Sequence, residues 1–194
     1  MPSHDELPPV VSEMDPAFVS QAGAMLARAF ETDPLFMHMF EQAQVREPGL
    51  RQVMGAMVRL CLAQGRVYAS GDGQVQGCLC LQLPGKRASS WQTLKGWLPS
   101  FWNLGLLFAR HGLRTKGLDA LRLLDQLERN RPEQGHLYVE ALGVDPGCQR
   151  SGFGRALLLR GLELGQGAGV RAYLETSREE NVGYYERFGF QVVE

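Results

Sequence analysis

The sequence predicts a single α/β domain in which helices flank a mixed β-sheet. Its 194 residues are a suitable length for one hydrophobic core. A Gly-Asp-Gly turn at 71–73 separates two alternating apolar runs, 66–70 and 74–83, and this pattern predicts an antiparallel hairpin. Later, a strand, a helix and a strand follow one another over 137–176, with the spacing of a parallel βαβ unit. Because the chain contains both kinds of pairing, the sheet must be mixed.

The N-terminal part predicts a short strand and three helices. Residues 1–9 are expected to be a flexible tail, and residues 8–14 to include the first strand. Asp-Pro pairs at 15–16 and 33–34 each predict a helix start, because Asp is a favoured N-cap and Pro fits the first helical position. A third helix is expected from Pro48 to about Gln64, where apolar residues recur at helical spacing.

A helical insertion is predicted at 88–132, before the fourth strand. Its first part is rich in aromatic residues, which could pack in the core or line a pocket for a second substrate. The remaining elements are expected, in order, at 137–144 (fourth strand), 153–166 (helix), 170–176 (strand), 181–187 (short helix) and 190–193 (strand).

Composition argues against several classes of function. The chain has 20 Lys and Arg against 21 Asp and Glu, so the basic stripe of a nucleic-acid or anionic-membrane binder is not expected. No apolar run approaches the length of about 18–20 residues that crosses a bilayer, and the acidic, Pro-broken N-terminus is not a secretory signal. The four cysteines lack zinc-ligand spacing. We therefore expect free thiols, no metal, no membrane or nucleic-acid partner, and a cytoplasmic location.

The segment 149–154 (Gln-Arg-Ser-Gly-Phe-Gly) lies at the predicted start of a helix. Its two glycines permit a tight turn and a close approach to a ligand. The first N–H groups of a helix have no partner within it, and the helix dipole adds positive charge there. Such an end can bind a diphosphate, and Arg150 and Arg155 could add charge-assisted hydrogen bonds.

Three other interpretations of this segment must be distinguished from a cofactor loop. A Walker A loop requires Lys-Ser/Thr after its last glycine, but Phe153-Gly154 follows Gly152. A dinucleotide fingerprint requires Gly or Ala where Leu157 stands, although Glu175 lies at a suitable distance downstream. An ordinary tight turn between a strand and a helix stays open on these residues alone.

Two motifs together resemble those of the GNAT N-acetyltransferase superfamily. The first is Gln149-x-x-Gly152-x-Gly154 after a strand that ends Gly-Val, and the second is the segment 181–190 (Asn-Val-Gly-Tyr-Tyr-Glu-Arg-Phe-Gly-Phe). The C-terminal third is also similar to that of puromycin N-acetyltransferases. This resemblance implies a splayed mixed sheet of GNAT type and acetyl-CoA as a cosubstrate. It further implies direct transfer of the acetyl group to an amine in a ternary complex.

The resemblance also implies roles for particular residues. Tyr185 would protonate the departing thiolate, while Tyr184 is expected to pack in the core. The Leu142 N–H would stabilise the developing oxyanion, because backbone donors are preorganised. Asn181 could be a helix N-cap or contact the pantetheine arm. The acyl-CoA-binding core is expected at 137–193, with these contacts: Leu142, Gly143, Val144, Gln149, Arg150, Ser151, Gly152, Phe153, Gly154, Arg155, Asn181 and Tyr185.

Two carboxylates are candidates for the general base. Glu140 lies in the fourth strand among apolar residues, where a carboxylate is uncommon unless it is paired or functional. It is expected on the same face as Tyr138 and could act on the amine directly or through water. Glu175, near the end of the next strand, is the second candidate.

The expected acceptor is a primary amine of a small molecule, antibiotic-like or an amino-nucleoside. A protein or polyamine acceptor remains an alternative, as does a non-catalytic acyl-CoA-binding regulatory module. Members of the superfamily carry one more strand, which could be absent or lie beyond residue 194. An uncovered sheet edge would favour a homodimer.

Overall fold

The computed structural model describes residues 9–85, 98, 100, 102–107, 109–110 and 135–193. The expected N-terminal tail and most of the insertion predicted at 88–132 lie outside the described residues. The helices are η1 (Pro16–Phe18), α1 (Val19–Ala29), α2 (Pro34–Met39), α3 (Ala43–Gln64), η2 (Pro146–Cys148), α6 (Phe153–Gly167), η3 (Glu179–Asn181) and α7 (Val182–Glu186).

The sheet is mixed, as predicted, and its strands follow the order of the sequence. These are β1 (Val11–Glu13), β2 (Gly65–Ser70), β3 (Gly77–Gln82), β4 (Leu137–Val144) and β5 (Ala172–Leu174). The first four are antiparallel to their neighbours, and β4 and β5 are parallel. The hairpin and the βαβ unit predicted from the sequence are therefore both confirmed.

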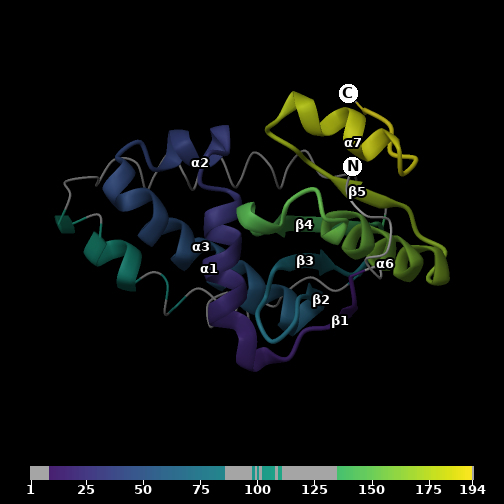
Figure 1. The fold of residues 1–194 in the computed structure, drawn as a ribbon, viewed down its shortest axis with the longest axis horizontal. Coiled ribbons are helices and arrows are strands. Elements are labelled where there is room, and N and C mark those ends of the chain that lie inside the picture. Colours follow the sequence, from purple (N-terminus) through teal and green to yellow (C-terminus); the bar gives the residue numbers. More distant parts are fainter. Residues whose placement is uncertain are drawn as a thin grey trace.

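Helices cover both faces of this sheet (Figure 1). On one face, apolar residues of α1, α2 and α3 pack against Val67, Cys78, Cys80 and Ala141. On the other face, Leu157 of α6 packs against a second group of buried strand residues that includes Leu79 and Leu137. The C-terminal helix α7 follows β5.

Both Asp-Pro helix starts are confirmed, because each Asp side chain accepts a hydrogen bond from the first turn. Asp15 accepts from the Ala17 N–H at 2.7 Å, and Asp33 from the Leu35 N–H at 3.0 Å. The predicted start of α3 is wrong. The helix begins at Ala43, with Pro48 inside it. Complete burial of Val45 on the N-terminal side of Pro48 stabilises this early start, which a local rule for proline cannot anticipate.

The strand predicted at 190–193 is also wrong. These residues have no regular secondary structure, and the Val192 and Val193 side chains are exposed. A strand requires a hydrogen-bonded neighbour. Among the described residues, the sheet ends at β5, and 190–193 pair with none of its strands.

Candidate active site

The two parallel strands, β4 and β5, separate soon after they pair. Leu137, Tyr138 and Val139 of β4 lie opposite Ala172–Leu174 of β5, but β4 then continues to Val144 without this neighbour. The C-terminal half of β4 therefore presents an edge that β5 does not pair with. This is the splayed arrangement that the resemblance to the GNAT superfamily implies.

A β-bulge in β4 determines which backbone groups face that edge. Cys80 lies opposite Ala141 and Leu81 opposite Val139, so Glu140 is an extra residue in the ladder. An extra residue shifts the alternation of the backbone by one position. The backbone N–H and carbonyl groups of β4 after Glu140 therefore point to the opposite edge of the strand from the one that an unbroken alternation would give.

Two hydrogen bonds confirm this change of direction. Before the bulge, the Leu137 N–H donates to the Arg171 carbonyl on the β5 side at 2.8 Å. After it, the Asp145 N–H donates to the Gln76 carbonyl on the β3 side, also at 2.8 Å. Since backbone N–H groups alternate along a strand, those of Leu142 and Val144 point away from β3, toward the open edge. Without the bulge, the N–H groups of Leu142 and Val144 would point toward β3.

The start of α6 lies directly beyond this edge. Arg150 and Gly152 have positive φ angles of 67° and 84°, which turn the chain sharply into the helix. The Ala156 N–H donates to the Gly152 carbonyl at 3.0 Å, so the N–H groups of residues 153–155 precede the helical ladder. No side chain caps the N-terminus, and no acidic residue occupies the first turn. The positive end of this helix can therefore accept an anion.

Side-chain contacts attach the loop at 145–152 to its surroundings. Asp145 accepts from the Gly147 N–H at 3.1 Å, and its other oxygen accepts from Nε and Nη2 of Arg28 at 3.1 and 2.5 Å. The hydrogen bonds from Arg28 lower the pKa of Asp145 below its ordinary value of 3.8. Gln149 also donates to the Val144 carbonyl, at 3.4 Å. The loop is thus attached to both α1 and β4.

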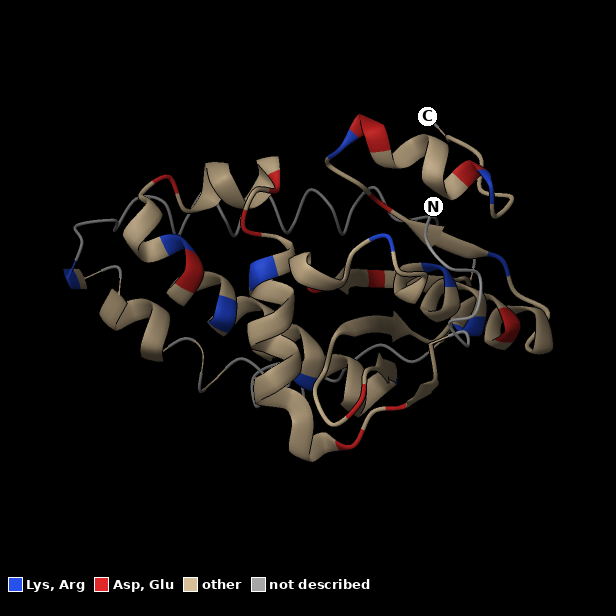
Figure 2. Ribbon diagram, in the orientation of Figure 1, with Lys and Arg blue, Asp and Glu red and all other residues tan. Residues whose placement is uncertain are grey.

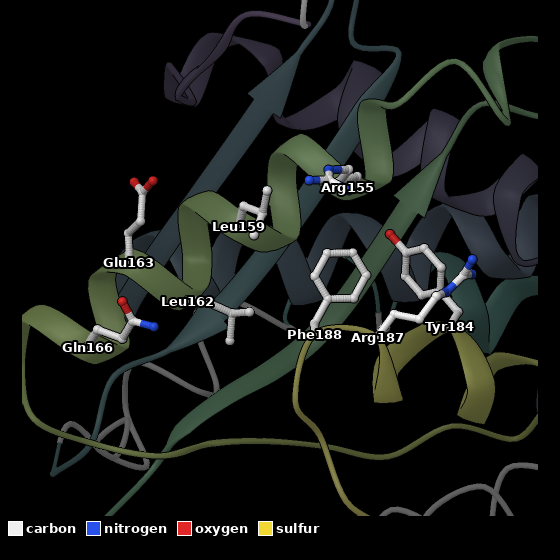
Figure 3. Close-up of a pocket in the computed structure, with 8 residues that line it drawn as sticks. All are labelled: Arg155, Leu159, Leu162, Glu163, Gln166, Tyr184, Arg187 and Phe188. Carbon is white, nitrogen blue, oxygen red and sulfur yellow. The ribbon is translucent and has the colours of Figure 1, made fainter.

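A pocket of about 420 Å³ lies between α6 and the α7 region. Figure 3 shows Leu159, Leu162 and Phe188 between Arg155 and Tyr184 at one end and Glu163 and Gln166 at the other. Arg187 also lines the pocket and lies over the Tyr184 ring, 5.5 Å from its centroid. The pocket therefore has an apolar middle and two arginines, one of them in the first turn of α6.

The neighbouring tyrosines Tyr184 and Tyr185 occupy different environments. A Cβ placed on Gly154 would lie 3.2 Å from the Tyr184 hydroxyl, so this hydroxyl is beside the first turn of α6. Tyr185 lies deeper, with its ring edge-on to Tyr184 and to Phe190. Burial raises the pKa of Tyr185 to about 12, and it also raises that of Tyr184. Both phenols are therefore protonated at neutral pH.

Sequence reasoning missed part of this pocket. Tyr184 was expected in the core, but it is half-buried and lines the pocket. Arg187 and Phe188 were not selected, although their spacing from Tyr184 by three and four residues indicates one shared face. Asn181 does occupy the N-cap position of α7, but not through its side chain. Its side chain makes no capping bond and donates instead to Thr176 Oγ1 at 3.2 Å.

Both candidate bases lie on the face of the sheet opposite α6. Glu140 accepts a hydrogen bond from the Gln82 side chain, and Gln82 follows Cys78 and Cys80 on the face that α1 and α3 cover. Tyr138 and Tyr173 stack on each other and donate to the two oxygens of Glu175, at 3.1 and 3.2 Å. Two tyrosine hydroxyls therefore hold Glu175, whereas Glu140 is the extra residue of the bulge.

Charged side chains of both signs are interspersed along the described ribbon (Figure 2). Among the described residues, no three His, Cys, Asp or Glu side chains gather in a way that could hold a metal ion. None of the described helices combines the length and the apolar character that a membrane crossing requires.

The chain is similar in sequence to a known acetyltransferase. A mycothiol acetyltransferase of Propionibacterium freudenreichii subsp. shermanii is 43% identical over 93 residues, which are 46% of this chain and 28% of that protein. The match to this curated relative thus spans less than a third of its length, and it is a different enzyme from the puromycin N-acetyltransferases that the motifs resembled.

Solved structures share the fold at low sequence identity. A Corynebacterium glutamicum structure described as histone acetyltransferase HPA2 and related acetyltransferase has a TM-score of 0.65 and 19% identity, covering 95% of this chain and 86% of its own. A GNAT family acetyltransferase from Brucella melitensis, in complex with acetyl-CoA, has a TM-score of 0.51 and 18% identity, covering 95% and 83%. Residues 61–190, more than half of the chain, match the acetyltransferase (GNAT) family model. The chain therefore belongs to the GNAT acetyltransferase family.

Proposed function

We propose that this protein transfers an acetyl group from acetyl-CoA to a primary amine of a small molecule. The observation that carries the proposal is the bulge at Glu140. It directs the N–H groups of Leu142 and Val144 to an open strand edge that leads to the uncapped start of α6. A ligand with amides in its middle and a diphosphate at one end matches this order of donors, and acetyl-CoA has that chemistry.

The chain offers a contact for each part of acetyl-CoA. The N–H groups at the start of α6 and the Arg155 guanidinium would hold the diphosphate. Leu142 and Val144 would bind the pantetheine amides and the thioester carbonyl. The pocket between α6 and α7, with Arg187 and an aromatic lining, would receive the nucleotide end. The acyl-CoA-binding core proposed here is residues 137–193.

The chemistry requires a neutral amine and a protonated leaving thiol. As the amine nitrogen attacks the carbonyl carbon, negative charge develops on the oxygen, and the Leu142 N–H would stabilise it. The carbon–sulfur bond then breaks, and Tyr185 would give its phenolic proton to the thiolate. The proton lost by the amine would pass to Glu140, directly or through water, and then to solvent.

The acceptor would approach from the face opposite α6. Both Glu140 and Glu175 are on that face, so an amine that arrives as a cation would meet carboxylates there before it loses its proton. This charge supports an amine as the substrate, and the acceptors proposed are an antibiotic-like amine or an amino-nucleoside. The name of the curated relative, a mycothiol acetyltransferase, also refers to a small molecule.

Titration calorimetry with acetyl-CoA, repeated with desulfo-CoA, tests the first part of the proposal. Binding of both is expected, because the diphosphate and the amides are common to the two ligands. Release of free thiol on addition of members of an amine library then tests transfer. Binding without thiol release for any amine would indicate an acyl-CoA-binding module, and absence of binding would reject the cofactor site.

Replacement of Glu140 by Gln is expected to lower kcat/KM about 100-fold near pH 7, the usual lower range for losing a general base. The loss should shrink as the pH approaches the pKa of the amine, about 10.4, since the substrate is then increasingly neutral without help. A pH–rate profile of both proteins measures this. Glu175→Gln is the matched comparison, and a larger, pH-dependent loss in that variant would make Glu175 the base instead.

A further inference from the structure

The end of α1 and the turn that follows it bridge the two strands that separate. We define residues 28–33 as the α1–α2 corner. At one end of the corner, Arg28 binds the Asp145 carboxylate, directly after β4. At the other end, Asp33 accepts a hydrogen bond from Ser177 at 2.6 Å, shortly after β5. These contacts join parts of the chain that are more than a hundred residues apart in sequence.

The contact on the β5 side consists of several bonds around a buried carboxylate. One oxygen of Asp33 caps α2 and the other accepts from Ser177. Arg178 donates to the carbonyl and the hydroxyl of Thr32 at 2.6 and 2.7 Å, and also to Glu180 at 2.9 Å. Asp33 itself is only 7% exposed, so its interactions are screened less by solvent than those of a surface pair.

The corner also packs closely against β4. A Cβ on Gly143 would lie 2.6 Å from Leu26 of α1 and 3.3 Å from both Ala29 and Phe30. Gly143 thus allows α1 to approach the strand between the two residues whose N–H groups point to the open edge. The corner is fixed against β4 by packing and an ion pair, and against the chain after β5 by hydrogen bonds.

We propose that Arg28 and Asp33 are positioning residues that set the distance between β4 and the segment that carries Tyr185. Backbone pairing of β4 with β5 ends at Val139 and Leu174, so it does not hold the strands together near Leu142. The α1–α2 corner spans this gap on the face opposite α6. It would thereby hold the Leu142 N–H and the Tyr185 hydroxyl on opposite sides of one thioester.

This inference rests on the proposed function, but part of its test is independent of activity. Ser177→Ala removes the bond to Asp33 and leaves the cap of α2 intact, and Arg178→Ala removes the bonds to Thr32. Amide hydrogen exchange of peptides covering 179–189 should become about tenfold faster in both variants, because this segment loses its attachment. Ser177→Thr keeps a hydroxyl and should restore slow exchange.

Kinetics of the same variants report the positioning role. Ser177→Ala and Arg178→Ala should lower kcat about tenfold, with KM for acetyl-CoA changed less than about threefold, since misplacement of a reacting group acts on the chemical step. Arg28→Ala should lower kcat in the same way, because it detaches the corner from the end of β4, and it should also raise KM for acetyl-CoA, because it releases the loop before α6. Glu47→Gln, which breaks the ion pair to Arg51 within α3, is the matched control.

The outcomes separate the two proposals. Unchanged exchange at 179–189 in both Ser177→Ala and Arg178→Ala would overturn the bridging role, and so would an equal loss of kcat in Glu47→Gln. If the wild-type protein transfers no acetyl group to any amine, the proposed function fails. Faster exchange in the two variants would then still support the attachment, while the catalytic positioning would be rejected.

Discussion

Tyr185→Phe is expected to lower kcat by about 10²–10³-fold, within the range for loss of a general acid. The hydroxyl is the only group removed, so the aromatic contacts with Tyr184 and Phe190 should persist. Affinity for desulfo-CoA should therefore stay within about threefold of the wild type, as the diphosphate and amide contacts are unaltered. Steady-state kinetics and calorimetry on the same preparations measure the two quantities.

The pH dependence gives a second check on Tyr185. Burial raises its pKa to about 12, so the phenol keeps its proton through the neutral and moderately alkaline range. Its action as an acid is lost only as the pH rises through that value. We therefore expect no decline in kcat from this residue below about pH 10, even though the amine becomes more reactive over that range.

Tyr184→Phe is the matched variant, because Tyr184 lies beside the first turn of α6 and lines the pocket. Its hydroxyl is expected to contribute to cofactor affinity more than to kcat. If Tyr184→Phe loses kcat while Tyr185→Phe retains it, the acid is Tyr184. If neither variant loses kcat, the thiolate leaves without a tyrosine acid.

Gly152→Val is expected to reduce affinity for acetyl-CoA by at least about 100-fold. Gly152 has a φ of 84°, a conformation that costs an L-residue about 1–2 kcal/mol and is worse for a β-branched one. Among the described residues, a Cβ there would meet only Pro9, at 3.8 Å, so backbone strain rather than crowding is the expected cause. Relief of that strain would turn the N–H groups at the start of α6 away from the diphosphate.

Gly169→Val controls for this strain. Gly169 has a φ of 67°, and within the described part of the chain an added Cβ would meet nothing within 4 Å, but Gly169 follows the C-terminal end of α6. The two variants should lose similar thermal stability, whereas only Gly152→Val should lose binding in the calorimeter. Equal affinities for acetyl-CoA in the two variants would show that the loop at 149–154 does not bind the diphosphate.

Elements with a strong local signal were predicted well. β4 has the predicted bounds of 137–144, and α6 begins at the predicted Phe153, because a glycine turn and a change of apolar period mark that boundary. Each Asp-Pro helix start depends on a hydrogen bond that the Asp side chain accepts from an N–H group two residues later, so neighbouring residues suffice to predict it. The sharp turn at 149–154 was also predicted, because its two glycines are a local signal.

Features that depend on distant residues were predicted poorly or not at all. The early start of α3 depends on the burial of Val45. Residues 190–193 form no strand because they have no partner strand among the described residues. The pocket required α7 to lie beside α6, which no motif specifies. In each case the deciding contact is made by a residue that is remote in the sequence.

The sequence alone therefore predicted the mixed sheet and the turn before α6, and it singled out Tyr185 and the two carboxylates as candidates, because each has a local pattern of residue types. The tertiary structure alone decided the orientation of these groups. The bulge at Glu140 exists only in pairing with β3, and it alone turns the Leu142 N–H to the open edge. Likewise, the attachment of Asp33 to Ser177 forms only when the first and last parts of the chain fold together, because hydrogen bonds between remote segments depend on the fold that brings them into reach.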